Sequence, residues 1–303
     1  MTSALATLRT WGEMIKFSHS VFALPFALMA AFLAGRNIAG RGLPYAGQLL
    51  LVVVCMVAGR SVAMTFNRIV DAQIDAANPR TAGRPLPAGR ITRAAAWAFL
   101  VLAAVTFAAA CFTFWFWYAN PWPMLLGGPV LVYLCGYSFS KRFTRWSHFH
   151  LGSAIALSPP AAWLAIHPDT LGIEAIVLMA AVTLWIGGFD IIYACQDIAV
   201  DRAQGLFSLP ALVGPARALW IARAAHTGTV ALLVLLAHLA GLGWLYLAGV
   251  AAAAVLLLVE NCLVHPGDFS KVNLAFFTVN GVVSLVMGGL TVADILLGLR
   301  PAF

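Results

Sequence analysis

The sequence predicts an all-α integral membrane protein with about nine transmembrane helices, arranged as two four-helix groups plus one around a central cavity. Hydrophobic residues make up 62% of the chain and the mean hydropathy is +0.91, whereas charged residues make up only 10%. A soluble domain carries roughly 25% charged residues. So much apolar surface cannot be hidden from water, and the lipid bilayer is therefore the expected solvent.

A helix that crosses a bilayer needs about 20 mostly apolar residues, and nine such runs follow one another along the chain. In order, the expected spans are 18–36, 47–66, 94–115, 122–139, 149–166, 172–193, 218–240, 243–263 and 272–298. No small-residue cleavage site follows the first run, which favours an uncleaved span over a signal peptide. The spans leave little chain for anything else, so we expect a single polytopic membrane domain over residues 1–303.

The basic residues orient the expected spans. Of the 18 Lys and Arg, Arg60 lies within the second span, and Arg36, Arg41 and Arg300 fall on the side opposite the N-terminus. The other fourteen share the side of the N-terminus, which places that side in the cytoplasm, with a bacterial inner membrane as the expected location. The net charge of +7 therefore reports orientation and implies no nucleic-acid partner. No obligate protein partner is implied, and the five scattered cysteines are expected to be free thiols.

The acidic residues are few and unevenly placed. Of eleven, Asp71 and Asp75 close the second span, and Asp190, Asp197 and Asp201 close the sixth. Moving the first pair along by 126 residues gives Asp197 and Asp201, a shift of four spans that preserves topology. The pattern predicts a pseudo-repeat of 1–140 and 141–265, with span nine (272–298) appended, and two aspartate pairs facing a shared cavity.

The first aspartate pair has the spacing of a cation site. On a helix Asn67, Asp71 and Asp75 stand one above another on a single face. Stacked carboxylates repel each other unless a cation lies between them, and Mg²⁺ suits because it keeps positions open for water and phosphate. An isolated pair of this kind could equally well only end a helix at the headgroup layer, but its repetition at Asp197 and Asp201 favours a functional site.

The loops on the same side supply positive charge. Four carboxylates with cationic side chains nearby describe a site for Mg²⁺ and a polyanion, and diphosphate fits best. The cationic residues are Arg80, Arg84, Lys141 and Arg142. No P-loop pattern is present, which argues against a nucleotide hydrolase of that type.

At these residues the sequence resembles the UbiA family of membrane prenyltransferases. The family's first motif, N-x-x-x-D-x-x-x-D, matches Asn67, Asp71 and Asp75, and its second, D-x-x-x-D, matches Asp197 and Asp201. The stretches Arg84 to Pro87 and Tyr137 to Arg142 also look like the family's. The resemblance implies Mg²⁺-dependent transfer of a polyprenyl group from its diphosphate to an aromatic acceptor, with these five motif residues binding Mg²⁺ and diphosphate and Lys141 contacting the diphosphate.

Three further stretches look closest to the branch that prenylates quinone precursors. They are Lys16–Phe26, Gly188–Tyr193 and Ala275–Gly281. That branch includes 4-hydroxybenzoate polyprenyltransferases of ubiquinone biosynthesis and the enzymes of the futalosine route to menaquinone, which use a dihydroxynaphthoate. Proteobacterial 4-hydroxybenzoate enzymes usually carry Asn-Asp at the start of the first motif, where this sequence has Asn67-Arg68.

Several polar residues are candidates for the acceptor side. Asp190 precedes Asp197 by two helical turns, and ionisable groups at such depth are expensive and point to function. We expect Asp190 to assist phenol activation or proton removal, Arg60 or Lys16 to hold an acceptor carboxylate, and Tyr193 to contact substrate. The structural alternative is that Asp190 and Arg60 only neutralise each other. His148 has no ligand spacing and is assigned no role, and helix-to-helix hydrogen bonding is expected for two further residues, Glu260 and Asn280.

Three other functions compete with prenyl transfer. A secondary transporter could use the paired aspartates for a coupling cation, but transporter sites usually lie near the midplane on broken helices. A CDP-alcohol phosphotransferase would need an upstream D-G-x-x-A-R element, and no Asp precedes Asp71. A scaffold without catalysis would not need four carboxylates in register.

Overall fold

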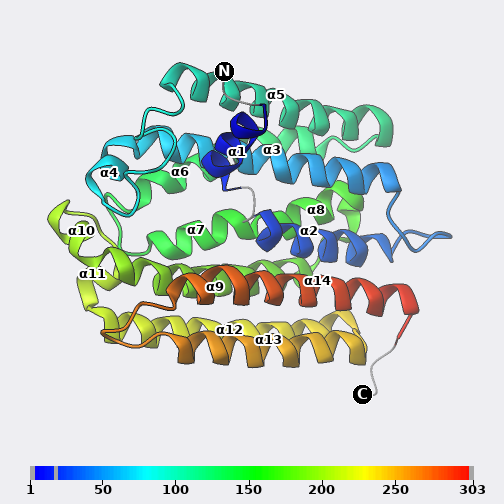
Figure 1. The fold of residues 1–303 in the computed structure, drawn as a ribbon. Helices are drawn as coiled ribbons and strands as arrows, with labels where there is room; N and C mark the ends of the chain where they lie inside the picture. Colours follow the sequence, from blue (N-terminus) through cyan, green and yellow to red (C-terminus); the bar gives the residue numbers. More distant parts are fainter. Residues whose placement is uncertain (1–3, 17–19, 300–303) are drawn as a thin grey trace. The chain divides into compact units, whose positions relative to one another are not determined.

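The computed structural model describes residues 4–16 and 20–299, and within them the chain is almost entirely helical (Figure 1). The first half holds α1 (Ala4–Ile15), α2 (Ser20–Gly35), α3 (Ala46–Val70), α4 (Ala72–Ala77), α5 (Arg93–Tyr118), α6 (Trp122–Ser140), α7 (Ser147–Ala156) and α8 (Ser158–Ile166). The second half holds η2 (Pro168–Thr170), α9 (Ile173–Ala194), η3 (Cys195–Asp197), α10 (Ile198–Ala203), α11 (Leu209–Val213), α12 (Pro215–Ala240), α13 (Trp244–Leu263), η4 (Leu274–Val279) and α14 (Asn280–Leu297).

The expected spans are helical wherever the structure describes them. Eight helical segments among the described residues are long and apolar enough to cross a membrane, and α2 adds a shorter apolar helix, Phe22–Gly35. Residues 18 and 19 of the first expected span lie outside the described residues. Phe116, Trp117 and Val132 remain more than 70% exposed, as expected of side chains that face lipid rather than water. The prediction of an all-α membrane protein is confirmed, with nine as an approximate count of spans.

The chain divides into two compact units. Unit 1 comprises Met1–Ser20 and Val53–Phe139, and unit 2 comprises Val21–Val52 and Ser140–Phe303. In unit 1, α3, α5 and α6 meet around Ala58, Phe107 and Cys111. A second apolar cluster joins Met14 of α1 to Ile69 of α3 and to Leu86 in the loop before α5. This second cluster fixes the loop that follows the first aspartate motif.

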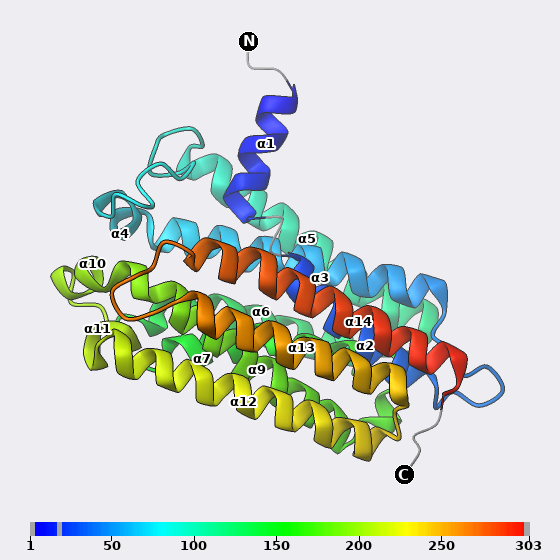
Figure 2. The same cartoon turned by 60° about the horizontal axis from the view of Figure 1, so that its bottom comes forward.

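Unit 2 is built around α9, which packs against α7, α8 and α12. The last long helices, α12, α13 and α14, run side by side in both views (Figures 1 and 2). Helix α7 approaches α9 closely at Gly152, where a Cβ atom would lie 2.4 Å from the backbone oxygen of Thr183. Small residues allow such close helix packing in membranes, where dispersion contacts replace the hydrophobic effect.

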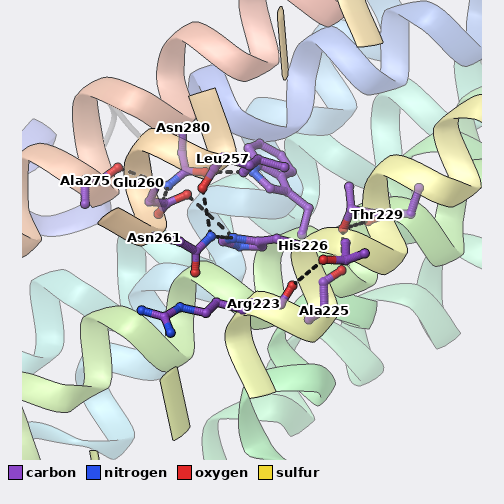
Figure 3. Close-up of polar contacts among 12 residues, drawn as sticks. Arg223, Ala225, His226, Thr229, Leu257, Glu260, Asn261, Ala275 and Asn280 are labelled. Atoms are coloured by element: carbon purple, nitrogen blue, oxygen red, sulfur yellow. Dashed lines mark hydrogen bonds and ion pairs between the residues drawn. The ribbon is translucent and has the colours of Figure 1, made fainter. Parts of the chain in front are cut away.

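A buried polar network ties four of these helical segments together (Figure 3). Asn280 donates to Glu260 Oε1 at 2.7 Å and to the Ala275 carbonyl at 3.2 Å, and it accepts from Trp185 Nε1 at 2.7 Å. Beside it, Asn261 Nδ2 donates to His226 Nδ1 at 2.8 Å. The expectation of hydrogen bonding between helices for Glu260 and Asn280 is therefore confirmed. Their bonds fix the π-helical turn η4, which ends at Val279.

Candidate active site

Both aspartate motifs lie where a long helix gives way to a short one. Asp71 separates α3 from α4 with φ −91° and ψ 6°, and Asp197 precedes α10 with φ −102° and ψ 4°. This bridge region of backbone space is sparsely populated and is common among active-site residues. The uninterrupted helix assumed from the sequence is thus wrong at both places, although the backbone hydrogen bonds Asp71 N to Asn67 O and Asp75 N to Asp71 O keep the i, i+4 register.

The first motif forms a buried group of hydrogen-bonded side chains. Asn67 Nδ2 donates to Asp71 Oδ2 at 3.0 Å, and Arg84 Nη1 donates to Asp75 Oδ1 at 2.7 Å. The Arg68 Nη1 atom lies 3.2 Å from Asn67 Oδ1 and 3.9 Å from Asp75 Oδ2. Asp71 and Asp75 are only 2% and 4% exposed. Within the described part of the chain, Asp75 Oδ2 is buried without a hydrogen-bond donor, so one carboxylate oxygen is left for a further ligand.

Positive charge exceeds negative charge around this motif. Arg68 lies within electrostatic reach of Asp71, Asp75 and Arg84. Burial, followed by the repulsion of three arginines, lowers the pKa of Lys16 below 10.5. The three arginines are Arg68, Arg84 and Arg80, and the Glu13 carboxylate opposes their effect on Lys16. Four cationic side chains therefore accompany Asp71, Asp75 and Glu13. Such an arrangement attracts an anion that carries more than one charge.

The loop after α4 holds Arg84 in place. The hydroxyl of Thr81 donates to the carbonyl of Asp75 at 2.8 Å, and buried Leu86 packs into the apolar cluster with Met14. Farther along, Arg90 donates to the Gly83 carbonyl and to Glu13. The Arg84 guanidinium is therefore positioned by a loop that is anchored on both sides of it.

The second motif lies in unit 2 beside a different set of charges. Lys141 and His148 act electrostatically on Asp201, as does Asp197. The carbonyl of Lys141 accepts from Phe207 N at 2.7 Å, which ties the end of α6 to the loop before α11. Arg142 is exposed next to it. Of the residues predicted here, the structure brings Lys141 close to the second aspartate pair.

The residues predicted for the acceptor side have separate surroundings. Asp190 Oδ2 lies 2.7 Å from Nδ1 of His148, the partner that the structure shows for this carboxylate. Buried Arg60 Nε has no hydrogen-bond acceptor among the described residues, and Tyr137 acts on this guanidinium electrostatically. The ring of Tyr193 packs on Phe276 of η4 with centroids 4.3 Å apart. Residues 17–19, which follow Lys16, lie outside the described residues.

Sequence reasoning missed two residues of this site. His148 received no role because it stands 42 positions before Asp190, and no spacing rule joins residues so far apart. Arg68 was seen only as a departure from a family pattern, yet it is 5% exposed and lies against Asn67 and Asp75. Its position directly after Asn67 was the one signal that the sequence offered.

The donor set suits Mg²⁺ better than a metal that needs many protein ligands. No group of three His, Cys, Asp or Glu side chains able to hold a metal occurs among the residues that the structure describes. Mg²⁺ is commonly held by one or two carboxylates and completes its shell with waters and substrate phosphates. A carboxylate pair in which Asp75 Oδ2 accepts no hydrogen bond from the described residues fits that requirement.

Fold and site together define an all-helical integral membrane protein with two aspartate motifs and an anion-attracting cluster of cations. The model of the UbiA prenyltransferase family matches residues 23–282, and the chain belongs to this family. It is accordingly a prenyltransferase.

Relatives and solved structures agree with this assignment. The chain is 30% identical over 267 residues to a 4-hydroxybenzoate octaprenyltransferase of Alkalilimnicola ehrlichii, covering 88% of each protein. It is 31% identical over 256 residues to the enzyme of that name from Aeromonas hydrophila, covering 84% of this chain and 86% of the relative. No support emerges for a secondary transporter.

Two solved structures share the fold. A UbiA homologue from Aeropyrum pernix K1, solved in its apo form, matches with a TM-score of 0.80 and 30% identity over 91% of this chain and 98% of the other. A UbiA homologue from Archaeoglobus fulgidus bound to GPP and Mg²⁺ matches with a TM-score of 0.67 and 18% identity, covering 94% and 99%. The second likeness supports the fold alone.

Proposed function

We propose that this protein transfers a polyprenyl group from a polyprenyl diphosphate to an aromatic quinone precursor, 4-hydroxybenzoate or a dihydroxynaphthoate, in ubiquinone or menaquinone biosynthesis. The observation that carries the proposal is the first motif, where four cations accompany two buried carboxylates. The names of the relatives support 4-hydroxybenzoate as the first acceptor to test. The reaction side is the cytoplasmic face of a bacterial inner membrane.

The two aspartate motifs hold Mg²⁺ in this proposal. The ligands are Asp71, Asp75, Asp197 and Asp201. Helices α4 and α10 each contain six residues, and they are separated by the same 126 positions as the two motifs. Asp71 and Asp197, which precede these helices, have nearly the same φ and ψ. This local likeness supports a duplication of 1–140 and 141–265, with 272–298 appended. It also favours one kind of ligand for both motifs.

Cationic and amide side chains bind the diphosphate. Asn67, Arg80, Arg84, Lys141 and Arg142 take this role, and the neighbours of Lys16 favour the diphosphate over the acceptor for that residue as well. Mg²⁺ held by these aspartates would supply charge neutralisation to the diphosphate leaving group. The guanidinium and ammonium groups add to this effect, because they meet the negative charge that develops on the leaving group.

The residues proposed for the acceptor are Arg60 of α3 and Asp190 and Tyr193 of α9. Arg60, whose Nε has no acceptor within residues 4–16 and 20–299, binds the carboxylate of the substrate. Asp190 accepts a hydrogen bond from the substrate hydroxyl, which makes the ring more electron-rich. Tyr193, stacked on Phe276, offers an aromatic wall for the ring. The prenyl tail lies against apolar helix surfaces, which also exclude water from the reactive cation.

The test is an assay of the purified protein with 4-hydroxybenzoate and a dihydroxynaphthoate, each with several polyprenyl diphosphates and Mg²⁺. Prenylated product and released diphosphate are measured together. Asp71→Ala and Asp197→Ala are each expected to lower the rate by about 100-fold or more, the scale of losing a group that stabilises developing charge. Asp169→Ala, which removes an exposed acid in η2, is the matched control. Full activity in either motif variant would show that the assigned site is wrong.

A further inference from the structure

His148 is bonded at both ring nitrogens, and the two bonds fix where its proton lies. Nε2 lies 3.2 Å from the backbone nitrogen of Leu209, and a backbone N–H can only donate. Nε2 must therefore carry the lone pair, which leaves the proton of the neutral ring on Nδ1. Nδ1 is 2.7 Å from Oδ2 of Asp190 and so donates to that carboxylate.

The geometry also separates the roles of the two side chains. The side chain of His148 is 6% exposed, whereas that of Asp190 is 22% exposed. An incoming molecule can therefore meet the carboxylate, while the imidazole stays behind it. Protonating Nε2 would break the bond from Leu209 and place two N–H groups against each other, so the ring is set up to donate to Asp190 and not to relay a proton.

We propose that His148 is a positioning residue that holds the Asp190 carboxylate in one orientation, so that it can accept a hydrogen bond from the hydroxyl of the aromatic acceptor. The inference rests on the role given to Asp190 under the proposed function. A donor that fixes one oxygen of a carboxylate makes the remaining lone pairs point in a defined direction, which orients the group toward its next partner. The other interpretation is structural: His148 would only anchor the turn before α11 through Leu209.

Two substitutions separate these roles, because each amide side chain reproduces one end of the imidazole. His148→Asn places an amide N–H near the position of Nδ1 and keeps a donor for Asp190. His148→Gln reaches the position of Nε2 and keeps an acceptor for Leu209 N. We expect His148→Gln to lower kcat/KM for the aromatic acceptor by about 10- to 100-fold, the usual cost of losing a group that orients a functional residue. The KM for polyprenyl diphosphate should stay unchanged, and His148→Asn should keep activity within about threefold of wild type.

A double-mutant cycle gives the second readout. In an Asp190→Asn background, His148→Gln should cause no further loss, because the partner through which it acts is already altered. Activity in His148→Gln with loss in His148→Asn would overturn the proposal in favour of the anchoring role. The proposal would also be overturned if His148→Gln and His148→Asn lost activity equally and each loss multiplied with the loss caused by Asp190→Asn. Full activity in both His148 variants would overturn it as well.

A spectroscopic measurement is independent of turnover. In protein labelled with ¹⁵N-histidine, one ring that is protonated at Nδ1 at neutral pH should be present in wild type and missing in His148→Asn. A ring protonated at Nε2 instead would refute the proposal. If wild type transferred no prenyl group to any aromatic acceptor, the proposed function would fail, whereas the tautomer would still test the hydrogen bond to Asp190.

Discussion

Replacing Asn280 by Leu should destabilise unit 2 without changing the volume of the side chain greatly. The substitution removes the hydrogen bonds of Asn280 to Glu260 Oε1 and to the Ala275 carbonyl (Figure 3), and the bond that it accepts from Trp185 Nε1. Asn280 and Glu260 are fully buried, and Trp185 is 1% exposed. All three partner groups would lose their bonds at a place that water does not reach.

The magnitude follows from the number of orphaned groups. An unsatisfied buried donor or acceptor costs about 1–3 kcal/mol, and hydrogen bonds between membrane helices are worth about 0.6 kcal/mol on average and about 1.7 at most. Taking roughly 1 kcal/mol for each of the three groups gives a loss of about 3 kcal/mol. For a chain of 303 residues, that loss lowers the midpoint of thermal unfolding by roughly 5 °C.

The assay is thermal unfolding in detergent, followed with a dye that fluoresces on reaction with thiols. Cys111 and Cys195 are buried, so the signal reports opening of the fold in each unit. Glu260→Gln is the matched control, because the glutamine oxygen still accepts from Asn280 and the variant should melt within a few degrees of wild type. An unchanged midpoint for Asn280→Leu, or an equal loss for Glu260→Gln, would refute the reasoning.

Three further predictions concern the diphosphate site and the packing of unit 2. Arg84→Gln should raise the KM for polyprenyl diphosphate by about 10-fold or more, since a charge-assisted contact is worth roughly 1.5–3 kcal/mol, whereas steady-state kinetics of Arg9→Gln, at an exposed surface pair, should match wild type. Because the pKa of Lys16 is lowered, its ammonium loses its proton at a pH below 10.5, and the KM for polyprenyl diphosphate should rise as the pH increases through this pKa. Lys16→Arg should remove this alkaline rise in a pH series. A rise of the same size in the variant would contradict the assignment. Gly152→Ala should destabilise the protein in the same thermal assay because its Cβ would lie 2.4 Å from a backbone oxygen, whereas Gly289→Ala, with open space at its Cβ, should be tolerated or slightly stabilising; similar midpoints would contradict the packing.

The lowered pKa of Lys16 also makes the stability of the folded protein depend on pH. Burial and neighbouring arginines disfavour its charged form in the folded protein, so the folded state releases its proton at a lower pH than the unfolded chain does. The penalty is fully present below the lowered pKa and is relieved as the pH rises towards 10.5. Under the proposed function, a bound diphosphate would offset the penalty by supplying negative charge, and stabilisation by this ligand should therefore weaken at alkaline pH.

The helices could be predicted closely because lipid imposes a simple rule on sequence. Each span needs about 20 apolar residues, and the expected run 218–240 corresponds to α12, Pro215–Ala240. The interruption at Leu157 between α7 and α8 and the π-helical turn η4 were not foreseen. Both lie within apolar stretches, where a change of helix type leaves no mark on composition.

The candidate site was predicted in part. Paired acids are easy to recognise in a chain with so few charges. The sequence alone was therefore enough to single out four residues, Asp71, Asp75, Asp197 and Asp201. The bond from Arg84 to Asp75 spans nine residues and depends on the anchored loop between them. A role for Asn280 as an acceptor of the Trp185 N–H, 95 residues earlier in the chain, depends on helix packing and has no local signal.

The sequence by itself predicted that this protein spans a membrane, the approximate number of its membrane-spanning helices, and which carboxylates to propose as ligands, because hydropathy and the scarcity of charge are properties of composition and spacing. Only the tertiary structure decided which partners those groups receive. His148 was one unremarkable histidine among seven until α7 packed against α9 and placed its ring on Asp190. Hydrogen bonds are short and directional, so they are fixed only once the helices that carry their donors and acceptors have packed.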